Sequence, residues 1–223
     1  MSKVSHKVYC AGPLFNPKER EEMKSIASAL KGAGYSVFLP QEDGIELAKL
    51  LPVLIEKDIR VEDATRLVNM AIFSLDVFQI ISSDGLVVNM NGRVPDEGAM
   101  VEAGIAWAHG KYIVIFRNDD RSLIQGSCNP LVIGLSDFES VSDYGDIPAA
   151  FDRRFQDGIN GTPRLLESGF EITDRKGKTI SEYLSTGKTV NEVVDLLLAL
   201  FGEALCLNTK KQRQKFSGAR ALQ

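Results

Sequence analysis

Carboxylates are the side chains of this sequence whose spacing could do chemistry. Asp96 falls in a loop bounded by proline and glycine, and Glu102, six residues later, begins an apolar run. Asp76 lies upstream in the segment FSLDVF. A carboxylate with an apolar surround can attack a sugar carbon, and a second carboxyl that holds a proton near neutral pH can help the leaving group depart. Retaining glycosyl chemistry uses such a pair close together.

Spacing alone leaves further roles open for these acids. They could be surface acids or helix caps, and metal binding by the same acids is a weaker alternative. The two histidines, His6 and His109, do not lie in a ligand-like cluster, so we expect no metal site. Trp107 and the phenylalanines near 73–78 fit a hydrophobic core better than a surface on which a base could stack.

The elements that must position these acids alternate between strand and helix patterns. Short apolar runs predict strands at 7–11, 35–39, 85–90 and 111–117. Helical spacing covers 17–32, a long tract to about 83 with expected breaks near Pro52 and Asn69, and the run around Glu102. This alternation predicts a doubly wound parallel sheet, Rossmann-like or flavodoxin-like, flanked by helices. The acids would then lie at the carboxyl edge of the sheet, where ligands bind.

The second half of the chain has weaker periodicity. Residues 129–135 could form a short element or an interface segment. Residues 136–187 are rich in Gly, Asp, Ser and Arg, and we expect an irregular C-terminal insertion there. We predict a single domain over 1–207, followed by a basic, flexible tail at 208–223.

Composition limits the class of protein. The chain has 223 residues, 44% hydrophobic and 25% charged, which suits one globular domain. A net charge of −4 argues against a nucleic-acid polymer as partner, though not against a nucleoside-sized ligand. The three cysteines are odd in number and far apart, which indicates reduced thiols. No apolar run reaches membrane-spanning length and no signal region follows the N-terminus, so we expect a cytoplasmic protein that contacts no membrane.

Several motifs, in order, resemble those of the nucleoside 2-deoxyribosyltransferases. They are VYCAGPLF at 8–15, Asp76 followed by DGLVV at 84–88, DEGAMVEAG at 96–104, and Gly110-Lys111 before a strand. The resemblance covers about residues 7–135. It implies an enzyme that moves the 2-deoxyribosyl group between nucleobases through a covalent glycosyl-glutamate, with some hydrolysis and no organic cofactor.

The resemblance also implies roles for individual residues. Glu102 would be the nucleophile, Tyr9 would orient its carboxylate, and Asp76 would exchange protons with the departing and incoming bases. Asp96 would bind a sugar hydroxyl. Asn129 would reach into the site of a neighbouring subunit, so the partners implied are deoxyribonucleosides, free nucleobases and further copies of the chain in a homo-oligomer.

Weaker assignments concern the loops. Gln41 and Asp43 follow the second strand in an expected loop at 41–44, where the family contacts the base. Gly12 and Gly98 would let backbone approach the sugar closely. Each of these roles has a plainer rival, since loop residues of these types also serve turns, as Asn129 before proline could.

Two other functions remain open at this point. One is a hydrolase, a deoxynucleoside 5′-monophosphate N-glycosidase. The resemblance implies that relatives with this activity have a first loop rich in Gly and Ser, which binds the 5′-phosphate, and a serine shortly before the nucleophile. The first loop here is AGPLF at 11–15 and the run before Glu102 is GAMV, so phosphate binding is disfavoured. The other is a non-catalytic nucleotide-binding module, which would not need a buried nucleophile.

Overall fold

The structure is a computed structural model that describes residues 6–92, 96–119, 129–160, 169–187 and the positions 189, 192, 193, 196, 197 and 199–201. The chain divides into two compact units, Met1–Leu166 and Glu167–Gln223. This division differs from the single domain that the sequence predicts over 1–207. All predicted site residues belong to the first unit.

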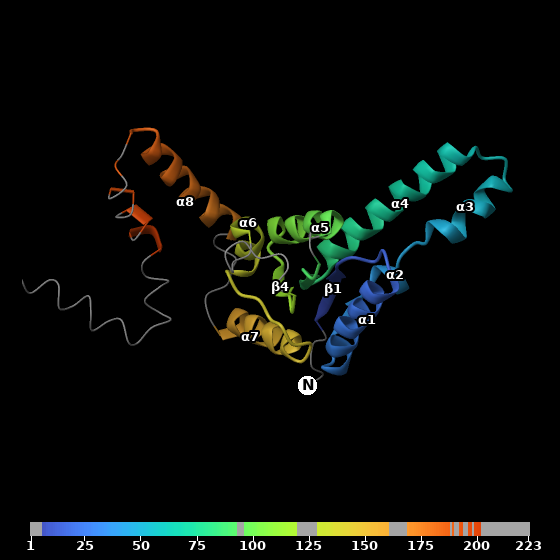
Figure 1. The fold of residues 1–223 in the computed structure, drawn as a ribbon, viewed down its shortest axis with the longest axis horizontal. Coiled ribbons are helices and arrows are strands. Elements are labelled where there is room, and N and C mark those ends of the chain that lie inside the picture. The colour runs from blue at the N-terminus through green and yellow to red at the C-terminus, as the bar shows by residue number, and fades with distance from the viewer. Residues whose placement is uncertain are drawn as a thin grey trace, which may run out of the picture. The chain divides into compact units, whose positions relative to one another are not determined.

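A parallel sheet forms the centre of the first unit (Figure 1). Its four described strands are β1 (Lys7–Ala11), β2 (Ser36–Phe38), β3 (Gly85–Asn89) and β4 (Tyr112–Phe116), in the order β2-β1-β3-β4. Every pairing is parallel. This order and the helical connections are those of a doubly wound, flavodoxin-like sheet, which confirms the predicted fold class.

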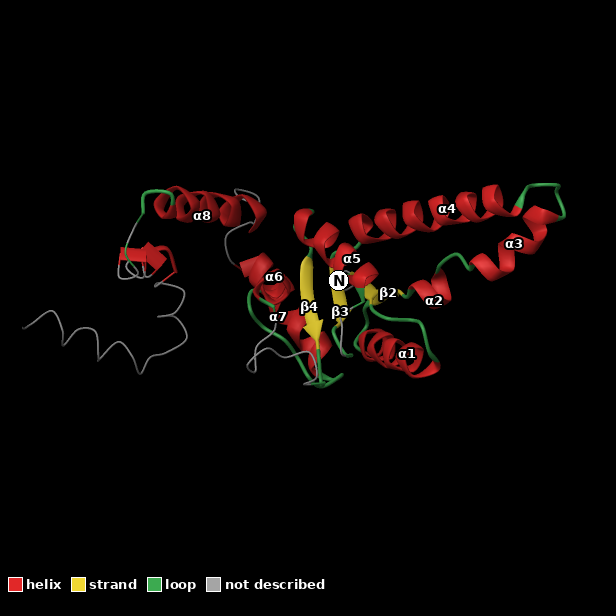
Figure 2. Cartoon of the chain, turned by 45° about the horizontal axis from the view of Figure 1, so that its top comes forward, coloured by secondary structure: helices red, strands yellow, loops and turns green. Residues whose placement is uncertain are grey.

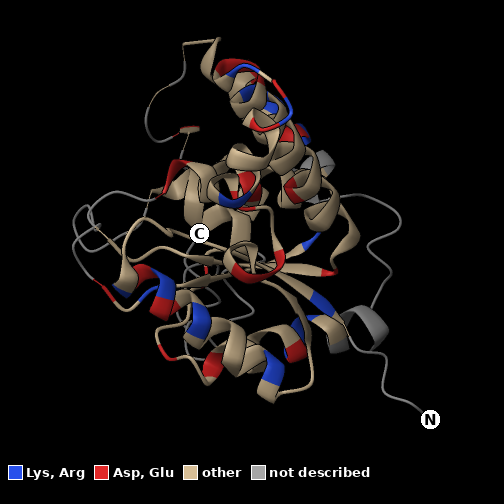
Figure 3. Ribbon diagram, turned by 90° about the vertical axis from the view of Figure 1, so that its right-hand side faces the viewer, with Lys and Arg blue, Asp and Glu red and all other residues tan. Residues whose placement is uncertain are grey.

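Helices cover both faces of this sheet (Figure 2). On one face, α1 (Pro17–Gly32) and α7 (Asp146–Asn160) pack against the side chains of Val8, Cys10 and Val87. On the other, α4 (Val61–Ser82) and α5 (Glu97–Ala108) pack against the face that carries Tyr9 and Leu86. The alternation follows from the period of two along a strand. Charged residues lie mainly on the helices (Figure 3), and Lys7 alone is charged within the four described strands.

Local sequence explains how α1 begins. Asn16 accepts a hydrogen bond from the backbone N–H of Glu19, while the Glu19 carboxylate accepts one from the backbone N–H of Asn16. This capping box, with Pro17 at the first helical position, satisfies N–H groups that a helix start leaves free. The buried stripe has helical spacing and consists of Met23, Ile26, Ala27 and Leu30.

The long helical tract is broken at a different place from the one predicted. Residues Pro40–Asp43 form a short helix, α2, and not a loop. Helix α3 (Leu47–Ile55) runs through Pro52, and α4 runs through Asn69 without a break. The chain reverses at 56–60 instead, where Asp58 has a φ of 60°. An isolated asparagine has too small a propensity effect to end a helix that tertiary packing holds.

The prediction of an irregular insertion at 136–187 is wrong. After α6 (Pro130–Ile133) and the 3-10 turn η2 (Gly134–Ser136), this region contains α7 and, in the second unit, α8 (Gly169–Leu184). Helix α7 buries Ile147, Phe151 and Phe155 at intervals of four residues. Their spacing was visible in the sequence, but the many polar residues between them obscured it.

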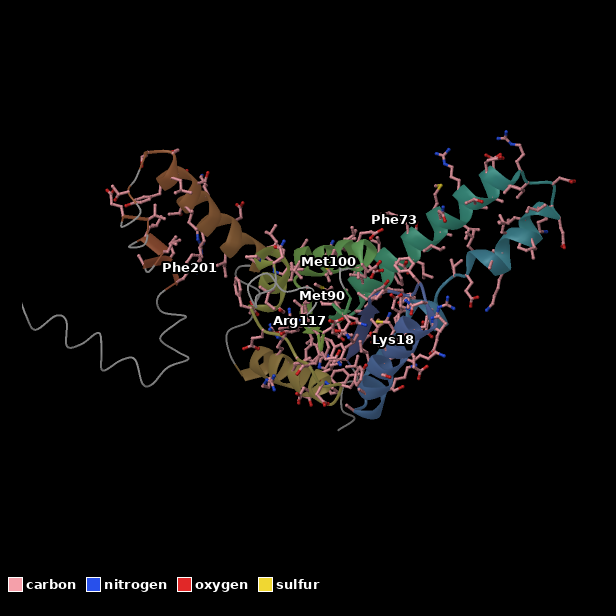
Figure 4. The ribbon with its side chains drawn as sticks, in the orientation of Figure 1. Lys18, Phe73, Met90, Met100, Arg117 and Phe201 are labelled. Carbon is pink, nitrogen blue, oxygen red and sulfur yellow. The ribbon has the colours of Figure 1, made fainter. Side chains whose placement is uncertain are left out.

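Helix α4 leaves much of its apolar surface uncovered. Phe73, labelled in Figure 4, is 66% exposed and Phe78 is 63% exposed, so the expectation that these phenylalanines belong to the core is wrong. By length and composition alone, α4 is also long and apolar enough to cross a membrane, so the expectation that no apolar run reaches this length is wrong. Its C-terminal part, however, packs on α5 and β1 of the sheet domain.

Candidate active site

Tyr9 and Glu102 meet on the face of the sheet that α4 and α5 cover. The Tyr9 hydroxyl donates a hydrogen bond of 2.6 Å to Oε1 of Glu102. Tyr9 is fully buried in the middle of β1, and Glu102 comes from α5. A short hydrogen bond from a phenol to a carboxylate stabilises the ionised carboxylate and fixes its direction.

Burial dominates the electrostatics of this pair and of Asp76. It raises the pKa of Glu102 to about 7, an effect that the hydrogen bond from Tyr9 opposes and the charges of Asp76 and Asp96 reinforce. Burial also raises the pKa of Asp76 to about 6. The pKa of Tyr9 rises far above its ordinary value, chiefly through burial and then through the charge of Glu102, so this hydroxyl remains a donor. The structure thus brings two acids with raised pKa values near enough for the charge of Asp76 to act on Glu102.

The start of α5 explains how Glu102 is aimed. Asp96 is the N-cap, and its Oδ2 accepts a hydrogen bond of 2.8 Å from the backbone N–H of Ala99. The buried residues of α5 are Ala99, Ala103 and Ala106. Because their side chains are small, the helix packs close to the sheet, within reach of Tyr9. Asp96 therefore has a structural role, and its charge still acts on Glu102.

Lys7 fixes the helix that carries Asp76, and sequence reasoning missed it. The Lys7 ammonium donates hydrogen bonds to Oε1 of Gln79 and, at 3.3 Å, to Oγ of Ser82 near the end of α4. Lys7 lies two residues before Tyr9 and therefore on the same face of β1. A charged residue in an otherwise apolar strand was the available signal.

The two predicted glycines lie where protein atoms pack closely. A Cβ on Gly12 would lie 2.5 Å from Sδ of Met23 and 2.9 Å from Cβ of Asn89, so no larger residue fits without movement. A Cβ on Gly98 would lie 3.3 Å from Oδ2 of Asp96, the atom that caps α5. Both glycines permit close approach, and the groups that approach in this structure belong to the chain itself.

Three predicted binding residues form hydrogen bonds with backbone groups of their own chain. Nε2 of Gln41 donates to the carbonyl of Arg20 at 3.0 Å, while its Oε1 is buried without a hydrogen-bond partner. Oδ2 of Asp43 accepts a hydrogen bond from the backbone N–H of Leu39. Asn129 caps α6 by accepting one from the backbone N–H of Leu131. No hydrogen bond joins these three to Glu102, Tyr9 or Asp76 among the described residues.

A polar network beyond the ends of β3 and β4 also escaped sequence reasoning. Asn91 and Asn118 exchange two hydrogen bonds, of 2.8 Å from Nδ2 of Asn91 and 3.0 Å from the backbone N–H of Asn118. The backbone N–H of Gly92 donates to Asp119 at 3.2 Å. These bonds tie together the segments that follow the two strands. The signal was a pair of asparagines at the end of a buried strand, in NMN at 89–91.

Two open spaces in the described part of the chain are not lined by Asp76, Asp96 or Glu102. A cavity of about 460 Å³ lies between β4 and α7 and includes Ser136, Arg153 and Arg154 in its lining. A shallow groove of about 640 Å³ on α4 is lined by Val61, Met70, Phe73 and their neighbours. Within the part of the chain that the structure describes, no group of three or more His, Cys, Asp or Glu side chains could hold a metal ion.

The sheet and this site together define an α/β protein in which a phenol donates to one carboxyl and burial raises the pKa values of that carboxyl and a second one. The family model for nucleoside 2-deoxyribosyltransferases matches residues 8–182. The chain belongs to this family, and hence to enzymes that act on nucleosides and nucleobases. A comparison with curated protein sequences gives no significant match.

Three solved structures are similar to this chain, and the first of them shares its fold. A conserved protein from Enterococcus faecalis V583 is 21% identical, with a TM-score of 0.52, over 68% of this chain and 99% of its own. A 2-deoxyribosyltransferase from Bacillus psychrosaccharolyticus is 23% identical, with a TM-score of 0.48, over 64% and 90%. A CMP N-glycosidase from Clostridium botulinum is 15% identical, with a TM-score of 0.37, over 66% and 98%.

Proposed function

We propose that this enzyme transfers the 2-deoxyribosyl group between nucleobases through a covalent intermediate on Glu102. The observation that carries the proposal is the 2.6 Å hydrogen bond from Tyr9 to Glu102 in a site where burial raises the pKa of two acids. A nucleophilic carboxylate must be dry, directed and partly desolvated, and this one is. Family membership supports nucleosides as the substrate class.

In the first step, the ionised Glu102 carboxylate attacks C1′ of the deoxyribose. A C–O bond forms while the C–N bond to the base breaks, and its electron pair stays on the base nitrogen. Asp76, whose pKa of about 6 leaves part of the population protonated near neutral pH, gives its proton to the departing base. The Tyr9 hydroxyl keeps the attacking carboxylate in one orientation throughout.

In the second step, a different base enters and gives an N–H proton to the ionised Asp76. Its nitrogen attacks C1′, the bond to Glu102 breaks, and the carboxylate returns to its hydrogen bond with Tyr9. Water in place of the base would release free deoxyribose, which accounts for some hydrolysis. Neither step requires an organic cofactor or a metal ion.

The direct test supplies the enzyme with deoxyinosine and free adenine and follows deoxyadenosine by chromatography. A 2-fluoro-deoxyribosyl donor should in addition leave an adduct on the peptide that contains Glu102, detected by mass spectrometry. Glu102→Gln is the matched control, because glutamine keeps the size and the acceptor for Tyr9 but is not a nucleophile. Full activity of Glu102→Gln would exclude this mechanism, and free deoxyribose without any deoxyadenosine would favour an N-glycosidase.

The enzyme is proposed to act as a homo-oligomer in which Asn129 completes the site of a neighbouring subunit. Among the described residues, the Asn129 side chain makes one hydrogen bond, through its oxygen as the cap of α6, and the residue is exposed. Exposed apolar side chains also occur near the acids along their helices: Phe73 and Phe78 stand on either side of Asp76 in the sequence of α4, and Val101 precedes Glu102 on α5. A second subunit covering these residues would remove them from water.

A further inference from the structure

Tyr9 lies between residues of two neighbouring strands. Its partner in β2 is Phe38 and its partner in β3 is Leu86. All three side chains are buried in the cluster that α4 and α5 cover. The rings of Tyr9 and Phe38 stack, with centroids 5.5 Å apart and an angle of 22° between their planes.

The ring of Phe38 is also held from a second direction. Lys7 Nζ lies 5.9 Å from its centroid, within the range of a cation–π contact. The same ammonium binds Gln79 and Ser82 of α4. Phe38 therefore touches both side chains through which β1 holds the acids: Tyr9 for Glu102, and Lys7 for the helix of Asp76.

We propose that Phe38 is a positioning residue, whose ring holds the Tyr9 hydroxyl on the carboxylate of Glu102. This assignment rests on the proposed function, in which Glu102 is the nucleophile. A phenol can keep a 2.6 Å hydrogen bond only if its ring does not tilt, and a flat aromatic neighbour limits tilt in a way that an aliphatic side chain does not. Phe38 acts through Tyr9 and has no chemical role of its own.

The test compares Phe38→Leu with Phe151→Leu, a matched control. Phe151 is fully buried and stacks with Phe155 in the cluster on the opposite face of the sheet, so the same atoms are lost far from Tyr9. The readout is the pKa of Glu102, followed by NMR of proteins with ¹³C-labelled Glu side chains and assigned with Glu102→Gln.

A loosened Tyr9 stabilises the ionised carboxylate less, so Phe38→Leu should raise the pKa of Glu102 by about 0.5–1 unit. Phe151→Leu should leave this pKa unchanged, and Phe38→Tyr, which keeps the flat ring, should restore the wild-type value. The alkaline limb of the kcat profile should shift with the pKa of Glu102 in Phe38→Leu, while KM stays within about twofold of wild type.

An unchanged pKa of Glu102 in Phe38→Leu would overturn the proposal and make Phe38 an ordinary core residue. If Phe38→Leu does not fold, the same titration of Phe38→Met decides. The titration needs no turnover, so it separates the two proposals. A shifted pKa in the variant together with a wild type that transfers no deoxyribose would reject the proposed function and retain the contact between Phe38, Tyr9 and Glu102.

Discussion

At the scale of single residues, burial and hydrogen bonding act in opposite directions on the ionisation of Glu102. Burial raises the pKa values of Glu102 and Asp76, while the Tyr9 hydroxyl partly restores the acidity of Glu102. A free carboxylate in water would be ionised but poorly directed, and a buried one without a donor would stay protonated. The phenol lets a desolvated carboxylate ionise near neutral pH.

The pH dependence of turnover follows from these two groups. Glu102 must be ionised although its pKa is about 7, and Asp76 must hold a proton although its pKa is about 6. The active form is therefore the minor arrangement of one proton on the two acids, and its population rises through pH 6 and falls through pH 7. We expect a bell-shaped profile of kcat with its maximum between these values. Tyr9→Phe removes a donor that stabilises the carboxylate, so the pKa of Glu102 should rise by about 1 unit. Because Glu102 has the higher pKa of the two acids, the alkaline limb should move to higher pH by that amount and the maximal kcat should fall. An alkaline limb that does not move would mean that Tyr9 does not act on the ionisation of Glu102.

The raised pKa of Glu102 also makes a prediction for stability. Its pKa is above the unfolded value of about 4.3, so its contribution is fully present below that pH and is lost as pH rises through about 7. Glu102→Gln has no charge to bury. The free energy of unfolding of this variant, relative to wild type, should therefore be greater at pH 8 than at pH 5 by about 1–3 kcal/mol. Urea unfolding at both pH values measures it, and an equal difference at both would show that Glu102 ionises in the folded state as freely as in the unfolded one.

At the scale of elements, close packing brings the segments of the site together. The loop after β1 meets α1 and β3 at Gly12, where an added Cβ would strike Met23 and Asn89. On the other face, alanines bring α5 close to the sheet. The acids depend on these close contacts, because a shift of the elements by about one ångström would break the hydrogen bond between Tyr9 and Glu102.

Two glycines of the first unit should respond in opposite ways to alanine. Gly12→Ala should lower the free energy of unfolding by about 1–3 kcal/mol, since Met23 can move but Cβ of Asn89 moves only with its backbone. Gly104→Ala, in the middle of α5 with no atom within 4 Å of the added Cβ, should raise it by about 0.5–1 kcal/mol. Urea denaturation measures both. An unchanged free energy of unfolding in Gly12→Ala would show that the loop after β1 can move to accommodate the added Cβ.

At the scale of the whole molecule, the exposed apolar surface of α4 is typical of a protein–protein interface. If a second copy covers it, Phe73→Glu should weaken association by about 2 kcal/mol or more, because a charge would be buried in an apolar contact. Ser28→Glu adds the same charge to an exposed position of α1 and should leave association unchanged. Sedimentation over a range of concentrations measures both variants, and a wild type that is monomeric and active would exclude the shared site.

Complementation tests whether subunits share a site. Glu102→Ala and Asn129→Ala should each be inactive or weak, and Asn129→Ala should lose about 1–3 kcal/mol of transition-state stabilisation, as for a hydrogen bond to a bound polar group. Co-expression of the two should restore partial activity, since some hybrid sites contain both intact residues. Verified hybrids without restored activity would assign Asn129 to its own chain's site or to its cap of α6.

The sequence by itself determined the strands, the flanking helices and the identity of the main acid. Apolar runs with a period of two and a stripe with helical spacing are local patterns, so the sheet and α1 could be predicted from them. Glu102, Asp76 and Tyr9 were identified from motifs, because their types and order along the chain carry the resemblance to the family.

Only the tertiary structure decided how these residues act on one another. The sequence separates Tyr9 from Glu102 by 93 positions and from Phe38 by 29, and no local pattern records that they touch. The helices in 136–187 and the uninterrupted α4 were likewise missed, because packing overrides weak local preferences. The pKa values of the acids depend on burial and on neighbours across the sheet. Burial is a property of the assembled fold. The sequence therefore identified the candidate acids, and the structure showed how burial and neighbouring residues raise their pKa values.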